Sequence, residues 1–213
     1  MTAFKNFIDL GANLRDIISK GSPGTPKRRQ PRNFIKNAIK TYHKWAMTDG
    51  KFDITKGGLD LPLVVFDSWP AGTEILTVHN HMQKKIDSLA AKWNALLRCG
   101  ADDLGPSDSI SIEPPTVADG TFNDKQYVIP PPVIYGVATL GTTCALFWYD
   151  LERPEEPITT VAVLSFGNPN YDFWSTMAVA LFIVHIRDIM WDVRQDLIEK
   201  GLHKALEQED PDA

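Results

Sequence analysis

Residues 133–150 read VIYGVATLGTTCALFWYD, which is two runs of strand-forming residues separated by a glycine. β-Branched and aromatic side chains favour an extended backbone in both runs. Gly141 followed by Thr142 suits a tight reversal between them, so the stretch predicts a β-hairpin. A third run of similar composition, 158–166, follows a charged, proline-bounded loop, and the turn-forming residues 167–170 then end the pattern. We therefore expect three strands from this part of the chain.

The rest of the chain shows mainly the spacing of amphipathic helices. The expected helices cover residues 2–19, 33–47 with Asn33 as the cap, 74 or 78 to 97, and a last one from 170 or 172 onward. An apolar run at 61–66 predicts a strand buried on both faces, and 52–54 predicts another short strand. We expect the last helix to bury its apolar first half and to expose its second half. This order predicts an α/β or α+β fold, in which helices flank a small mixed β-sheet.

Composition and charge are typical of one soluble domain. Of the 213 residues, 43% are hydrophobic and 23% are charged, and the formal net charge of −5 argues against attraction of the whole surface to nucleic acid. The charge is unevenly placed, because residues 20–48 contain eight Lys/Arg and no acid. The expected organisation is an N-terminal amphipathic helix at 1–19, a basic linker at 20–32, an α/β domain at 33–206 and an acidic tail at 207–213.

Cysteine usage and the apolar runs predict the compartment. Cys99 and Cys144 are too few for a disulfide framework, so we expect free thiols and an intracellular location, nuclear or cytoplasmic. The N-terminus has no long apolar segment typical of a secretory signal. The longest apolar run, 177–184, is far shorter than the ~20 residues that span a membrane, so we expect no membrane contact.

A basic cluster in the linker is a candidate binding segment. Its pattern fits a nuclear address or an arm that contacts phosphates, and it fits a solvated linker equally well. The candidate nucleic-acid contacts are Lys27, Arg28, Arg29 and Arg32. Ser22 and Thr25 each precede a proline and are candidate phosphorylation sites, where added phosphate would cancel local positive charge.

The histidines do not form a diagnostic catalytic or metal-binding pattern. His79 and His81 could share a metal in an extended segment but diverge in a helix, and no further ligand follows at a typical spacing. We therefore expect a surface pair at the start of a helix. For His185, we expect a core histidine satisfied by one hydrogen bond. The sequence also contains no nucleophile elbow, dinucleotide fingerprint or P-loop.

Several features in order resemble fungal members of the restriction-endonuclease-like, PD-(D/E)xK nuclease-like superfamily. A predicted helix with Gln83 and Trp93 comes before the run PVIYGVATLG at 132–141. An aromatic strand ending FWYD, a third strand and a closing helix with Arg187 and Trp191 follow. The resemblance covers about residues 33–205 and implies a restriction-endonuclease-like fold.

The same resemblance implies a site in which two acids hold a divalent metal such as Mg²⁺ and a lysine supports the attacking hydroxide. Asp60 and Asp67 match the two acids, as catalytic and metal-binding residues. Trp69 stands where the lysine belongs, and Lys84 or Lys85 can replace that lysine only by reaching back from the next helix. The resemblance thus implies a degenerate site that needs no cofactor.

We therefore expect a non-catalytic protein of the nuclease-like fold that binds nucleic acid or a protein partner. One alternative is an active metal-dependent nuclease that uses Asp60, Asp67 and Mg²⁺. Another is a protein-interaction module or effector that docks its N-terminal helix into a partner's groove without binding nucleic acid.

Overall fold

The computed structural model describes residues 5, 7–19, 30–49, 61–102 and 127–200. Its strands form one sheet in the order β1-β2-β3-β4. β1 pairs in parallel with β2, and the other neighbours pair antiparallel. The strands are β1 (Val64–Trp69), β2 (Ile134–Leu140), β3 (Thr143–Tyr149) and β4 (Thr159–Ser165). The expectation of a mixed α/β fold is confirmed at this level.

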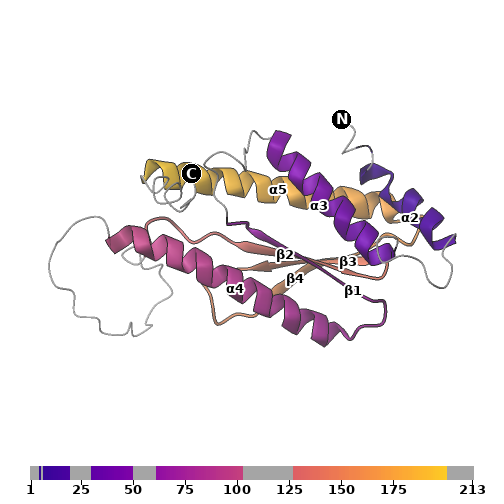
Figure 1. Cartoon of the computed structure of the whole chain (residues 1–213), viewed down its shortest axis with the longest axis horizontal. Helices are drawn as coiled ribbons and strands as arrows, with labels where there is room; N and C mark the ends of the chain where they lie inside the picture. The colour runs from indigo at the N-terminus through magenta and orange to yellow at the C-terminus, as the bar shows by residue number, and fades with distance from the viewer. Residues whose placement is uncertain (1–4, 6, 20–29, 50–60, 103–126, 201–213) are drawn as a thin grey trace, which may run out of the picture.

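Helices cover both faces of the sheet (Figure 1). α4 (Ile75–Asp102) lies on one face and connects the parallel strands β1 and β2, as parallel pairing requires a crossover. α3 (Pro31–Asp49) and α5 (Asp172–Glu199) lie on the other face. α2 (Leu10–Ser19) packs against both of these helices. The architecture is therefore three layers, with the sheet in the middle.

The predicted hairpin is present. β2 and β3 pair from Ile134↔Tyr149 to Leu140↔Thr143, and Gly141 in the turn has a φ of 59°, which favours glycine. Gly136 in β2 lies under α4, where an added Cβ would be 2.8 Å from Met82 Cε. The central strand and α4 therefore pack closely at this glycine.

The start of α3 differs from the prediction. The helix begins at Pro31, and the carbonyl of Gln30 accepts hydrogen bonds from the N–H groups of Asn33 and Phe34. Proline suits the first turn because its missing N–H has no helical partner there. Asn33 is therefore not the cap, and its side chain instead accepts a hydrogen bond from Ser68 Oγ in β1 at 3.1 Å.

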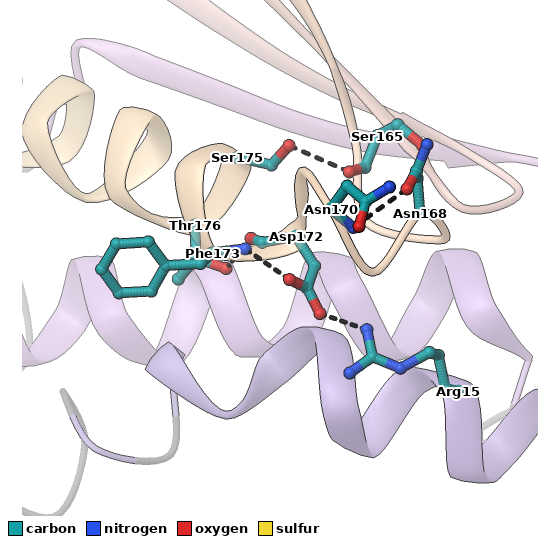
Figure 2. A network of polar contacts seen from close by, with 8 residues as sticks. All are labelled: Arg15, Ser165, Asn168, Asn170, Asp172, Phe173, Ser175 and Thr176. Carbon is teal, nitrogen blue, oxygen red and sulfur yellow. Dashed lines mark hydrogen bonds and ion pairs between the residues drawn. The ribbon is translucent and has the colours of Figure 1, made fainter.

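The N-terminal helix belongs to the same core as the sheet. Phe7, Leu10 and Leu14 are fully buried, and the Phe7 ring stacks on Tyr42 of α3 at a centroid distance of 4.6 Å. Figure 2 shows Arg15 of α2 paired with Asp172 at the start of α5. These three apolar side chains of the helix thus pack against other residues of the same chain. Residues 20–29 of the expected linker and the expected strand at 52–54 lie outside the described residues.

α5 differs from the expectation that it buries its first half. One side packs in the core, but Phe173, Trp174 and Leu181 on the other side are 47%, 68% and 65% exposed. Among the described residues, α5 is the helix long and apolar enough to cross a membrane, with a mean hydropathy of 1.4 over 18 residues, of which 39% are buried. A core helix passes the same test, so the expected lack of membrane contact stays a prediction.

Candidate functional site

β1 is an edge strand whose side chains alternate between the two helical layers. Asp67 and Trp69 point toward α4, where the Trp69 ring lies 5.5 Å from that of His81. Phe66 and Ser68 point toward α3, where they contact His43 and Asn33. A strand places successive side chains on opposite faces, so the predicted acid Asp67 and the predicted indole Trp69 lie on the same face. Trp69 is the last residue of β1.

The carboxylate of Asp67 contacts two side chains from α4, Lys85 and His81. Its Oδ2 accepts a hydrogen bond from Lys85 Nζ and lies 3.3 Å from His81 Nε2, while Oδ1 accepts the Ser68 N–H at 2.7 Å. Burial alone raises the pKa of Asp67, but the hydrogen bonds from Lys85 and Ser68 and the charges of Lys85 and His81 outweigh it. The pKa therefore falls below its usual value, and the group is a carboxylate at neutral pH.

The structure brings together part of the expected nuclease site. Lys85 does reach back from α4 to Asp67, which is the condition under which it could replace the missing lysine. Asp60, the second expected acid, lies outside the described residues. No group of three His, Cys, Asp or Glu suited to a metal occurs in the part of the chain that the structure describes. What remains is one acid whose charge is matched by its neighbours.

His79 and His81 lie on α4, and His185 lies on α5. His79 and His81 diverge on α4, as a helix requires: His79 Nε2 lies 3.3 Å from the carbonyl oxygen of Ile158, whereas His81 faces Asp67. The expectation that His185 is a core residue is wrong, because α5 leaves it exposed, with Nε2 3.0 Å from the hydroxyl oxygen of Tyr135. The apolar first half of α5 has no amphipathic period in the sequence. The sequence therefore did not indicate that His185 lies on an exposed side of the helix.

A row of lysines runs along α3 beside β1. Lys36, Lys40 and Lys44 are four residues apart, which places them along one side of the helix. Lys40 Nζ lies 5.6 Å from the centre of the Phe66 ring, so this side borders the edge strand. His43 beneath it is mostly buried, and burial followed by the charge of Lys40 lowers its pKa to about 4. His43 is therefore neutral at pH 7, and the lysines supply the charge.

A second row runs along α4 on the other side of β1. Lys85 and His81 face Asp67, and helical spacing places Lys84 and Lys92 on or next to the same side. In Figure 1, β1 runs between α3 and α4, and both helices contact it. We call this region the β1-edge surface: it comprises Lys36, Lys40, Lys44, Asp67, Trp69, His81, Lys84, Lys85 and Lys92.

The β1-edge surface is different from the basic site expected from sequence. Lys27, Arg28 and Arg29, and the candidate phosphorylation sites Ser22 and Thr25, lie outside the described residues. Arg32 lies in the first turn of α3, and its carbonyl accepts a hydrogen bond from Thr139 Oγ1 at 3.0 Å. The lysines of α3 belong to the acid-free segment 20–48, and their four-residue spacing was the signal that could have placed them on one face.

Comparisons of this chain with protein-family models, with curated proteins and with solved structures found no match. The resemblance to the nuclease-like superfamily therefore stays a prediction from the sequence. The β1-edge surface is the feature of the described structure that indicates a function.

Proposed function

We propose that this protein binds a single strand of nucleic acid at the β1-edge surface and does not cleave it. The observation that carries the proposal is the pair of lysine rows on α3 and α4, which border one edge strand. A groove of positive charge can follow a phosphate backbone, and a partly exposed aromatic side chain such as Trp69 can stack on a base.

The local charge supports this proposal even though the whole chain is acidic. The formal net charge is −5, so the β1-edge surface is a concentration of positive charge on an otherwise negative molecule. Asp67, the acid between the two rows, is paired with Lys85 and His81. Such a distribution favours approach of a polyanion to one face and disfavours it elsewhere.

The state of Asp67 supports binding without cleavage. Metal-dependent phosphate hydrolysis needs carboxylates that are open to a divalent cation. Both oxygens of Asp67 already accept hydrogen bonds from the protein, and Oδ2 lies between Lys85 and His81. A cation would have to displace Lys85 to bind there, so we assign Asp67 the role of positioning Lys85 and His81.

Charge reversal at single lysines tests the location of binding. Fluorescence anisotropy with a labelled oligonucleotide measures Kd for Lys40→Glu and Lys44→Glu on α3 and for Lys92→Glu on α4. Each change should weaken binding about fivefold, the effect of roughly 1 kcal/mol. Lys200→Glu, at the end of α5, makes the same charge change away from the β1-edge surface and should leave Kd within about twofold.

If the oligonucleotide does not bind, or if Lys200→Glu weakens binding as much as the other changes, the lysine rows are not the binding site. The alternative in which the N-terminal helix docks into a partner has less support, because Phe7, Leu10 and Leu14 are buried within this chain.

A further inference from the structure

The second edge of the sheet, β4, is apolar and exposed. β4 is the last strand in the sheet, and no strand among the described residues pairs with its outer side. Its sequence, TTVAVLS, contains no charge, and Val161 and Val163 are 53% and 66% exposed. An edge strand of this kind offers unpaired backbone N–H and C=O groups to another strand.

The two edges of the sheet differ in how they are protected. β1 is flanked by Pro62 and Pro70 and carries Asp67, and proline and charge are common means of preventing an edge from pairing. β4 carries no charge and has a closely flanking proline, Pro157, on one side alone, and its irregularity is a bulge at Val161, between the pairs Phe147↔Thr160 and Leu146↔Ala162. The segment after the bulge is regular, so β4 is the edge suited to a partner strand.

An apolar cavity adjoins β4 on the face that α4 covers. α4 packs on β1 and β2, and beside it a cavity of about 240 Å³ opens over β3 and β4. Its lining includes Phe147, Val163 and Ile75, and Ile75 is 79% exposed. The apolar surface therefore continues from the edge of β4 to the start of α4, and a strand added beside β4 would cover part of it.

We propose that the occupant is a second copy of this chain, whose β4 pairs antiparallel with the first. The sheet then continues across the two-fold axis in the order β1-β2-β3-β4-β4-β3-β2-β1. With the axis through Val163, this residue lies beside its counterpart, on the face that carries the cavity. Isologous dimers of this kind are the commonest oligomers, because one self-complementary surface serves both subunits.

The distribution of charge favours the antiparallel copy. The loop before β4 carries Asp150, Glu152, Glu155 and Glu156 against the single base Arg153, whereas residues 166–171 after β4 carry no charge. Antiparallel pairing puts each acidic loop beside the uncharged end of the other strand. Parallel pairing would bring the two acidic loops together, where like charges repel. The proposal does not depend on nucleic-acid binding.

Sedimentation equilibrium of the full chain tests the proposal. The wild-type protein should have twice its chain mass of 23.8 kDa at a concentration of about 50 μM. This concentration is above the Kd of most specific dimers. Val163→Lys should be monomeric at the same concentration with an unchanged circular dichroism spectrum. Ile198→Lys, the same type of change at an exposed residue of α5, should remain dimeric.

A second variant tests the register of the β4–β4 pair without disrupting the proposed interface. Val163→Cys should form a disulfide with its counterpart under mild oxidation, because residues directly opposite in an antiparallel pair have Cβ atoms about 5 Å apart. A monomeric wild-type protein overturns the proposal. A dimer that persists in Val163→Lys also overturns it, since the contact must then lie elsewhere.

Discussion

Lys85 on α4 donates a hydrogen bond to the carboxylate of Asp67 on β1, eighteen residues earlier in the chain. The contact links the edge strand to the helix that follows it and positions a lysine within the β1-edge surface. The Lys85 side chain is 40% exposed and the Asp67 side chain 18%, so the pair lies at the boundary between solvent and core.

Removal of the Lys85 charge should raise the pKa of Asp67 toward its usual value. Lys85→Met eliminates a hydrogen bond and a positive charge that both favour the carboxylate, while the burial that opposes it remains. Carbon-detected NMR titration of the Asp67 carboxyl group measures the change. A pKa of Asp67 that does not move would mean that Lys85 does not stabilise the charged form.

The same pair predicts how stability depends on pH. Because the folded protein lowers the pKa of Asp67, the stabilisation is present above the unfolded-state value of ~3.9 and is lost as pH falls through the folded value. Lys85→Met should therefore reduce the free energy of unfolding by about 1 kcal/mol or less at pH 7. The difference from wild type should vanish at lower pH, as chemical denaturation at several pH values will show.

Gly136 should not tolerate a side chain without rearrangement of Met82. A Cβ at this position would lie 2.8 Å from Met82 Cε and 3.2 Å from Ile86 Cδ1. Gly136→Ala should reduce the free energy of unfolding by about 1–3 kcal/mol, the usual cost of overpacking. The double variant with Met82→Leu should lose less than the sum of the single changes, because Met82 Cε is gone. Strict additivity would contradict this packing.

The chain should not cleave nucleic acid in the presence of Mg²⁺ or Mn²⁺. Asp67 is bonded to Lys85 and Ser68, and it faces His81. A gel assay of labelled single-stranded DNA and RNA checks this expectation, with Asp67→Ala as the matched control. Cleavage by the wild type that is lost in Asp67→Ala, while binding persists, would establish the active nuclease instead.

Local sequence patterns were sufficient for much of the fold. The hairpin at Gly141 was predictable because a glycine between two strand-forming runs has few other roles, and the structure confirms it. The strand 158–166 and the helix from Asp172 were predictable for similar reasons. The start of α3 was not, since Asn33 and Pro31 both fit a helix start and only the contact with Ser68 decides between them.

The candidate site was less accessible to sequence. Asp67 was identified from a resemblance, and Lys85 was considered as its partner, but periodicity does not show that α4 returns over β1. The lysine rows of α3 and α4 border the same strand only because β1 is at the edge of the sheet, and strand order is a tertiary property. The exposed side of α5 was hidden for a related reason, because an apolar surface carries no period when every face is apolar.

The salt dependence of binding tests the central claim most directly, because it counts the phosphates that the lysines neutralise. The Kd for a labelled single strand, measured by anisotropy at several salt concentrations, should give a log–log slope of the association constant of about −3, as for roughly four phosphate contacts. Lys40→Glu should make that slope shallower by about 0.7 or more, and Lys200→Glu should leave it unchanged. A slope near zero, or no binding at low salt, would contradict nucleic-acid recognition at the β1-edge surface.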